Sequence, residues 1–278
     1  MTVKHFFETK LSQVFGAYAE NICFYYFSYH KKISAKDSIE QLKLDGIFFL
    51  AQYDLNRLLA GVPVQYVISF IEVLGYEFET SPEALIPRPE TEELIQLIHE
   101  LHLHANSQKV LDIGTGSGII PISLKKKHAD WELVGIDIST KALSLATKNA
   151  RNLKVDIRFL NEDIFNFNST ETYDIIISNP PYIPKRECLL LEDSVRNFEP
   201  TLALEVPDDN PLIFYKAIIN YAVKHLTKNG SLYFEIHQNF GEELLEEVKP
   251  FFQNCILRKD FAKNNRFILA SVLQDNIN

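Results

Sequence analysis

The tetrapeptide Asn179-Pro180-Pro181-Tyr182 is the feature of the sequence best suited to chemistry. Neither proline has a backbone N–H, so a turn built from them presents carbonyl oxygens, and the side-chain oxygen of Asn179 adds a further acceptor. A planar NH₂ group can donate one hydrogen to the Asn179 side chain and the other to the Pro180 carbonyl, while the Tyr182 ring offers a face for stacking. We therefore predict that Asn179, Pro180, Pro181 and Tyr182 bind a substrate with a planar amine or amide.

A glycine-rich turn, Asp112-Ile113-Gly114-Thr115-Gly116-Ser117-Gly118, follows an expected strand and precedes an expected helix. This arrangement is typical of nucleotide-cofactor sites, because glycine lets a ligand approach the backbone closely. The spacing does not fit the dinucleotide fingerprint, since Ile119 or Pro121 stands where its last glycine or alanine is required. An acid ahead of the first glycine would repel a pyrophosphate but suits a cofactor with an ammonium group and no phosphate. S-adenosylmethionine (AdoMet), whose product is S-adenosylhomocysteine, has both properties. The cofactor-binding residues expected in the turn are Asp112, Gly114, Thr115, Gly116, Ser117 and Gly118.

Further cofactor contacts are expected where the next strands end. Asp137 ends the second strand about 20 residues beyond the glycines, where a carboxylate can accept hydrogen bonds from two ribose hydroxyls. The alternative for Asp137 is a helix N-cap or a surface charge. After the third strand, Asp163 is expected to accept from the adenine amine and Ile164 to pack on the ring. Asn179, after the fourth strand, is counted among the cofactor-binding residues as well.

The two sites together predict methyl transfer from AdoMet to an amide or aryl-amine nitrogen. Such a nitrogen is a poor nucleophile because its lone pair is delocalised. Acceptors that hold both of its N–H bonds aim it at the sulfonium methyl and stabilise the positive charge that develops on it. Asn179, Pro180 and Tyr182 are the predicted catalytic residues. The reaction needs no metal, and the three cysteines of the chain lack zinc-ligand spacing.

Alternating strands and helices from residue 109 onward supply the framework for these sites. Continuous apolar runs such as residues 175–177 suit central strands that are buried on both faces. The pattern predicts an α/β, Rossmann-like fold with a parallel sheet covered by helices, which binds ligands outside the carboxyl ends of its strands. The expected strands cover residues 109–113, 132–138, 157–160, 173–178, 231–236, 254–258 and 266–272.

The first quarter of the chain has a different pattern. Apolar residues recur at helical spacing in residues 1–66 and predict a small helical bundle. β-branched and aromatic residues around Gly75 predict a β-hairpin. We therefore expect an N-terminal helical substrate-docking domain at 1–66, a connecting β-hairpin at 67–86 and an AdoMet-dependent methyltransferase domain at 87–278.

The composition excludes several classes of protein. Of the 278 residues 46% are hydrophobic, so general disorder is excluded. The net charge is −9, and residues 1–66 hold 7 Lys and Arg against 6 Asp and Glu, so the acidic excess lies in the later part. That balance argues against a broad nucleic-acid surface. The sequence shows neither a signal peptide nor the apolar run of about 20 residues that a membrane span needs. We expect a cytoplasmic protein with no membrane contact.

Several short segments of the later part carry a resemblance to one family. They are residues 85–92, 112–118, 179–183, 198–200 and 234–236. Together they resemble the HemK/PrmC family, the release-factor glutamine N5-methyltransferases. Pro-Arg-Pro-Glu-Thr-Glu and Phe-Glu-Pro are the specific motifs, whereas Asn-Pro-Pro-Tyr is shared with adenine DNA methyltransferases and some RNA methyltransferases. The chain departs from the family pattern at residues 206–211 and 259–266.

The resemblance implies a helical N-terminal domain, a connecting hairpin and a seven-stranded AdoMet-dependent domain. The implied substrate is the glutamine of the Gly-Gly-Gln motif in class I peptide chain release factors, methylated at its side-chain nitrogen N5. Residues 114–118, Asp137 and Ile164 match the family's cofactor contacts, and residues 179–182 match its glutamine-binding residues. Release factors are therefore the expected partners, direct contact with nucleic acid is not expected, and the expected state is a monomer.

Two alternatives remain open at the level of sequence. An N-methyltransferase specific for adenine or guanine in DNA or RNA would stack a flipped base on Tyr182 and need a basic track for phosphates. The acidic balance of the later part disfavours that track. The second alternative is a binding module that keeps the fold without turnover. The intact set of Asp112, Gly114, Asp137 and Asn179 disfavours it.

Overall fold

The computed structural model describes residues 1–30 and 32–274, and the chain forms two compact units. Residues 1–71, 80–82 and 192–198 belong to the first unit, and the remaining described residues belong to the second. The domain boundaries at residues 66 and 86 stay predictions. Every predicted site residue lies in the second unit.

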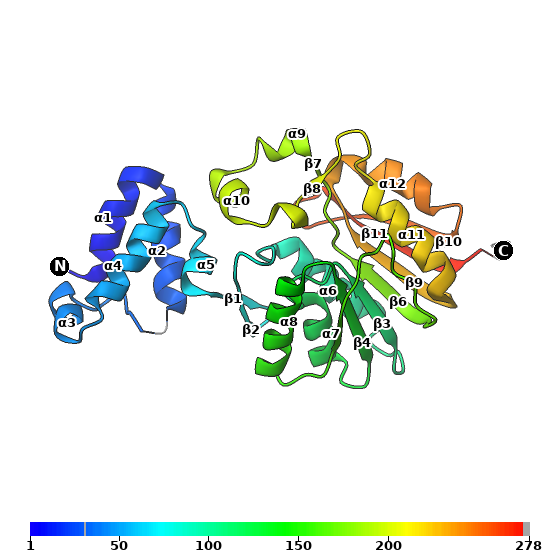
Figure 1. Cartoon of the computed structure of the whole chain (residues 1–278), viewed down its shortest axis with the longest axis horizontal. Coiled ribbons are helices and arrows are strands. Elements are labelled where there is room, and N and C mark those ends of the chain that lie inside the picture. Colours follow the sequence, from blue (N-terminus) through cyan, green and yellow to red (C-terminus); the bar gives the residue numbers. More distant parts are fainter. Residues whose placement is uncertain (31, 275–278) are drawn as a thin grey trace. The chain divides into compact units, whose positions relative to one another are not determined.

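A seven-stranded sheet forms the centre of the second unit (Figure 1). The strands lie in the order β10-β11-β9-β6-β3-β4-β5. Neighbours from β9 to β5 are parallel, whereas β11 is antiparallel to both β9 and β10. Their bounds are β3 (Lys109–Ile113), β4 (Glu132–Asp137), β5 (Arg158–Asn161), β6 (Tyr173–Ser178), β9 (Leu226–Glu235), β10 (Phe252–Lys259) and β11 (Asn265–Leu273).

This topology confirms the predicted α/β, Rossmann-like fold. Each expected strand is present, although β9 begins several residues earlier than expected and β11 runs opposite to the other strands of the sheet. The order of the strands reverses between β3 and β6, since β4 and β5 continue on one side of β3 and β6 lies on the other. In open α/β sheets, ligands bind outside the carboxyl ends of the strands at such a reversal.

Helices cover both faces of this sheet. Leu111 and Ile176 are fully buried in the core that also contains side chains of α11 and α12. Val110 and Ile175, one position earlier on the same strands, point to the opposite face and are fully buried too. The helices α6, α7 and α8 contact one another in sequence order, and α11 contacts α12. Their bounds are α6 (Pro89–Leu101), α7 (Ile119–Lys127), α8 (Thr140–Asn152), α11 (Ile213–His225) and α12 (Gly241–Val248).

The connection between β6 and β9 contains short elements that the sequence pattern does not reveal. β7 (Ile183–Pro184) pairs in parallel with β8 (Glu205–Val206), and the Ile183 N–H donates to the Leu204 carbonyl at 2.9 Å. This pairing fixes the chain directly after Tyr182. Between the two strands lie α9 (Lys185–Cys188), α10 (Asp193–Phe198) and the 3-10 turn η1 (Thr201–Ala203).

The first unit is a bundle of short helices with its own core. Phe7, Leu11 and Tyr26 are fully buried there, and the Tyr26 hydroxyl donates to the buried Asp54 carboxylate at 2.8 Å. The helices are α1 (Val3–Phe15), α2 (Tyr18–Tyr29), α3 (Ile39–Leu44), α4 (Phe48–Leu59) and α5 (Val64–Ile68). They are followed by a two-stranded sheet of β1 (Phe70–Val73) and β2 (Tyr76–Glu79), joined by a turn in which Gly75 has a φ of +79°.

Candidate active site

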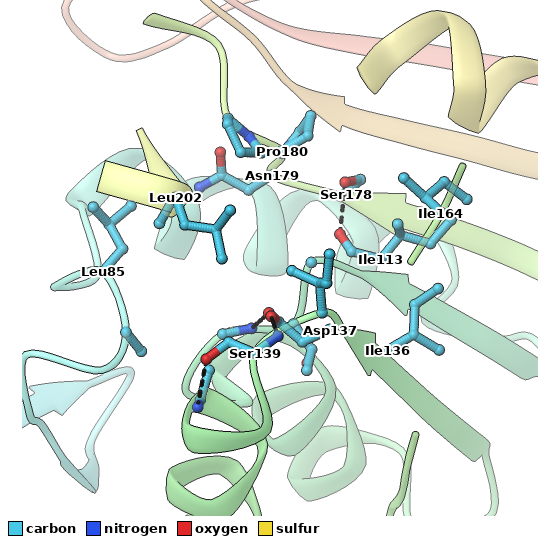
Figure 2. A pocket seen from close by; sticks show the side chains of 18 of the residues that line it. Leu85, Ile113, Ile136, Asp137, Ser139, Ile164, Ser178, Asn179, Pro180 and Leu202 are labelled. Atoms are coloured by element: carbon cyan, nitrogen blue, oxygen red, sulfur yellow. Dashed lines mark hydrogen bonds between the residues drawn. The ribbon is translucent and has the colours of Figure 1, made fainter. Parts of the chain in front are cut away.

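A pocket of about 450 Å³ lies in the second unit, at the carboxyl ends of β3, β4 and β6. Half of the residues that line it are isoleucine, leucine, proline or phenylalanine, and a third have polar or charged side chains. Figure 2 shows Asn179 and Pro180 on one side of this pocket and Asp137 with Ser139 on the other. A mainly apolar cavity with a few placed polar groups is the usual form of a small-molecule site.

The glycine turn contributes four of the predicted cofactor residues to the pocket lining, Gly114, Thr115, Gly116 and Ser117. Gly116 has a φ of +54° and Gly114 a φ of +74°, the left-handed region in which only glycine is unstrained. Gly118 has a different role. A Cβ atom there would lie 3.0 Å from the side chains of Ile122 and Ala146, so this glycine allows α7 and α8 to pack together.

Asp112 does not line the pocket but lies fully buried at the end of β3, directly ahead of the turn. Neither carboxyl oxygen of Asp112 has a hydrogen-bond partner among the described residues. Burial raises the pKa of Asp112 to about 7. A buried acceptor without a donor is costly in free energy. A donor such as the ammonium group of a ligand, or a water molecule, would lower that cost at Asp112.

Asp137 is the polar centre of the cofactor end of the pocket. One carboxylate oxygen accepts the Gly116 N–H at 2.9 Å and the other accepts the Ser139 N–H at 2.8 Å (Figure 2). Burial raises the pKa of Asp137, and these two N–H bonds oppose the shift. Each oxygen keeps a lone pair for a ligand hydroxyl. The alternative role as a helix N-cap is wrong, because the Ser139 hydroxyl caps α8 by accepting the Ala142 N–H.

Asp163 and Ile164 line the pocket after β5, as does Phe165, which the sequence pattern does not single out. The Asp163 carboxylate accepts the Phe165 N–H at 3.0 Å and an Asn166 side-chain N–H at 3.0 Å. Both bonds shape its own loop. Asp163 therefore positions the two apolar side chains, and its remaining lone pairs are available to a ligand amine.

The tetrapeptide after β6 is divided between the pocket and the core. Asn179, Pro180 and Pro181 line the pocket, and the Ser178 hydroxyl ties this end of β6 to β3 by donating to the Ile113 carbonyl at 2.6 Å. Tyr182 is not part of the lining. Its ring packs against the core, and its hydroxyl donates to Glu235 at 3.4 Å. Burial raises the pKa of the Tyr182 phenol, so it is neutral at physiological pH.

Two residues that the motifs do not single out, Thr91 and Glu235, form a chain of hydrogen bonds that ends on Asn179. The Asn179 side-chain N–H donates to the Thr91 hydroxyl at 3.2 Å, and that hydroxyl donates to the Glu235 carboxylate at 2.7 Å. Glu235 is 1% exposed, and burial raises its pKa to about 7. Both residues lie inside segments that carry the family resemblance, which was the only sequence signal for them.

A third missed residue, Glu199, holds the segment that precedes α6. Its buried carboxylate accepts the Ile86 N–H at 3.1 Å and pairs with the Arg88 guanidinium at 2.7 Å. The neighbouring side chains of Leu85 and Pro87 line the pocket. The Pro-Arg-Pro and Phe-Glu-Pro motifs therefore contact each other through the Arg88–Glu199 ion pair. This contact positions Leu85 and Pro87, which form an apolar wall of the pocket.

The residues around the pocket fit AdoMet. Its main requirements are a hydroxyl acceptor, an apolar slot for the adenine ring and an anionic environment for the ammonium group. Asp137 and the apolar residues Ile164 and Phe165 line the pocket and meet the first two requirements. The carboxyl of Asp112, which is buried outside the lining and has no hydrogen-bond partner among the described residues, suits the third. Among the described residues, no group of three or more His, Cys, Asp or Glu side chains is placed to hold a metal ion. No helix in the described part of the chain has the length and apolarity to cross a membrane.

Comparisons with known proteins identify the relatives of this chain. Residues 91–192 match the family model described as the Methyltransferase small domain. A release factor glutamine methyltransferase of Flavobacterium psychrophilum is 42% identical over 234 residues, 82% of this chain and 82% of that protein. One of Bacteroides thetaiotaomicron is 37% identical over 235 residues, 84% of this chain and 81% of that protein.

Among solved structures, the hMettl16 catalytic domain in complex with the MAT2A 3'UTR hairpin 6 has a TM-score of 0.58 and 17% identity to this chain. The alignment covers 84% of each chain. At that identity the likeness concerns the fold alone, and it agrees with the Rossmann-like topology of the second unit.

Replacing Asp137 tests the cofactor end of the pocket. Asp137→Ala removes the acceptor for ligand hydroxyls and releases the Gly116 N–H. We expect AdoMet affinity to fall by about 1–3 kcal/mol, the scale of an unsatisfied hydrogen-bonded group. Isothermal titration calorimetry measures the change, with the exposed Asp156→Ala as the control that removes a carboxylate elsewhere. Equal affinity of the Asp137→Ala variant and the control would remove Asp137 from the site.

Replacing Arg88 tests the contact that places the apolar wall. Arg88→Leu leaves the buried Glu199 carboxylate without its cation. We expect the free energy of unfolding to fall by about 2 kcal/mol, typical of a lost hydrogen bond to a charged group. Arg158→Leu is the control, because its pair with Glu171 lies nearer the surface and should contribute less than about 1 kcal/mol. Urea denaturation compares the two, and equal losses would contradict the assigned role.

Proposed function

This chain belongs to the release factor glutamine methyltransferases, and we propose on that basis that it methylates the glutamine of the Gly-Gly-Gln motif in peptide chain release factors. The methyl group goes from AdoMet to the side-chain nitrogen N5, and S-adenosylhomocysteine is the second product. The observation that carries the proposal is that Asn179 and Pro180 line the same cavity as Gly116 and Asp137. A nitrogen held at the first pair lies beside a cofactor held at the second.

Each predicted residue has a role in this proposal. Bound AdoMet supplies a methyl group attached to a positively charged sulfur. The glycine turn and Asp137 hold the cofactor, and Ile164 packs on its adenine. The Asn179 side-chain oxygen and the Pro180 carbonyl accept the two N–H bonds of the glutamine amide, which fixes the direction of its nitrogen lone pair. Pro181 shapes the turn.

The same two acceptors lower the barrier to methyl transfer. Bound AdoMet would supply the methyl group, and the amide nitrogen that accepts it would take up the positive charge that the sulfur loses. Oxygen acceptors on both N–H bonds stabilise that charge as it develops, until one proton leaves to water. Tyr182 supports the turn from the core side through its hydrogen bond to Glu235. We therefore treat Tyr182 as a residue that positions Asn179 and Pro180.

A base in DNA or RNA is a less suitable substrate for this chain. Relatives that align over about four fifths of its length are named for release factor glutamine. The acidic balance of the chain is also poorly suited to binding a phosphate backbone. The proposal therefore names class I release factors as partners, without direct contact with nucleic acid. We also propose that the protein is a monomer and that it acts in the cytoplasm, where release factors act.

The helices of residues 1–66 are proposed to dock the release factor. Large apolar side chains are exposed on this unit, including Phe24 at 68% and Phe49 at 79%. A contiguous apolar patch marks a protein interaction site, and we propose that these side chains contribute to one. The Gly-Gly-Gln loop alone is too small to identify one protein among many, so a second contact surface supplies the specificity.

Replacing Asn179 tests the proposed reaction. Asn179→Ala removes one of the two acceptors, and we expect the methylation rate to fall at least about 100-fold, as for the loss of a transition-state hydrogen bond. AdoMet affinity should stay within about threefold of the wild-type value. The assay uses labelled AdoMet with a release factor, DNA or RNA, and mass spectrometry locates the methyl group. Asn168→Ala, on an exposed loop, is the control. Label on DNA or RNA and not on the glutamine would contradict the proposal.

Replacing Phe49 tests the docking surface. Phe49→Ser and Phe24→Ser should raise the KM for the intact release factor several-fold, because the loss of each apolar contact costs about 1–2 kcal/mol. The kcat and the affinity for AdoMet should not change. Steady-state kinetics measure the split between KM and kcat. An unchanged KM in the double variant would show that the factor docks elsewhere.

A further inference from the structure

The amide of Asn179 can face a substrate in two ways that have nearly the same shape. With its oxygen forward it accepts hydrogen bonds, and with its nitrogen forward it donates them. A glutamine amide nitrogen needs the first arrangement. A carbonyl or carboxylate oxygen of a substrate would favour the second. What holds Asn179 in one orientation therefore decides which chemical group the site accepts.

While Glu235 is ionised, the hydrogen bonds from Asn179 through Thr91 to Glu235 have one possible direction. The ionised Glu235 carboxylate can only accept, so the single hydrogen of the Thr91 hydroxyl must point to it, at 2.7 Å. The Thr91 oxygen then has only lone pairs left for Asn179. It accepts the side-chain N–H of Asn179 at 3.2 Å. The Asn179 amide oxygen is left without a donor among the described residues.

We propose that Thr91 and Glu235 are positioning residues that set the donor and acceptor direction of Asn179, and thereby make the site select a substrate NH₂ group over an oxygen. This inference rests on the proposed function, because it concerns how glutamine is recognised. Thr91 lines the pocket and Glu235 does not, but the Thr91 hydroxyl is taken up by its hydrogen bonds to Glu235 and Asn179. Both act through Asn179.

The surroundings of Glu235 are those of a fixed acceptor. Its second carboxylate oxygen accepts the Tyr182 hydroxyl at 3.4 Å, and its backbone carbonyl accepts the Tyr215 hydroxyl at 3.0 Å. Glu235 is the last residue of β9, and its side chain is buried, bonds Thr91 of α6 and does not line the pocket. Burying a carboxylate is costly, and an apolar residue would pack there at lower cost. We infer that the buried charge of Glu235 serves to fix the direction of the hydrogen bonds from Asn179 to Thr91 and from Thr91 to Glu235.

The direction depends on Glu235 being ionised. Burial raises its pKa to about 7. The groups facing it are the Thr91 and Tyr182 hydroxyls, the Arg266 guanidinium, which favours the ionised form, and the Glu90 carboxylate, which opposes it. A protonated Glu235 can donate to Thr91, which frees the Thr91 hydrogen and releases the fixed direction. Selection of NH₂ should therefore be present above pH 7 and decline below it.

The test compares two forms of the release factor, one with the natural glutamine and one with Gln→Glu at that position. Their dissociation constants are measured by calorimetry with the enzyme loaded with S-adenosylhomocysteine, so that no turnover occurs. We expect the wild-type enzyme to prefer the glutamine form. In Thr91→Val, which keeps the shape and removes the hydroxyl, we expect that preference to fall about tenfold because Asn179 can turn its nitrogen forward.

Matched variants separate positioning from folding. Thr91→Ser keeps the hydroxyl and should restore the preference, whereas Thr147→Val makes the same exchange on α8 and is the control. Glu235→Gln keeps the shape but can donate as well as accept, so it should reduce the preference and abolish its dependence on pH between 6 and 8. AdoMet affinity and the thermal unfolding midpoint should stay near the wild-type values in Thr91→Ser and Glu235→Gln.

The outcomes are distinct. A preference for the glutamine form that is unchanged in both Thr91→Val and Glu235→Gln overturns the inference, even if either variant is less active or less stable. A wild-type enzyme that does not methylate the release factor at all overturns the proposed function instead. Methylation by the wild type together with a lower preference in both variants supports the inference.

Discussion

For an amide to react at its nitrogen, both of its N–H groups must donate hydrogen bonds to oxygen acceptors that fix the direction of the nitrogen. The proposed site meets this constraint with residues that cannot donate or are prevented from donating. Pro180 and Pro181 have no N–H, and the N–H of Asn179 that faces inward is occupied by Thr91. The strands of a parallel sheet all end at one edge, so β6 delivers this surface beside the glycine turn of β3 and the carboxylate of β4. In the proposed function, the fold thus brings the amide nitrogen of the substrate next to the methyl group of the cofactor.

Much of the cofactor end of this arrangement was predictable because it is local in sequence. The glycines directly after one strand and the acid at the end of the next lie within about 25 residues of each other, so a short stretch of sequence is enough to recognise the motif. The structure changed two details: Gly118 allows two helices to pack together, and Asp112 is fully buried and does not line the pocket. Tyr182, expected to stack on the substrate, instead packs on the core, since β7 pairs with β8 directly after it.

The residues that brace the substrate end were not predictable from local pattern. Thr91, Asn179 and Glu235 meet only because α6, β6 and β9 converge, and Glu199 lies 111 positions from its partner Arg88. A threonine or glutamate in isolation looks like a helix-surface or strand-end residue. The resemblance to a family marked these segments as specific, but their physical reason emerged from the hydrogen bonds. Pro-Arg-Pro-Glu-Thr-Glu combines a wall of the pocket with the residue that orients Asn179.

The central claim is that the site holds both hydrogens of the substrate amide. Nuclear magnetic resonance tests it directly on a release factor whose glutamine carries ¹⁵N in the side chain, bound to the enzyme with S-adenosylhomocysteine. We predict that both side-chain amide protons move downfield on binding, and that one of them returns to its free position in the Asn179→Ala complex. Binding that leaves both protons at their free positions would contradict it.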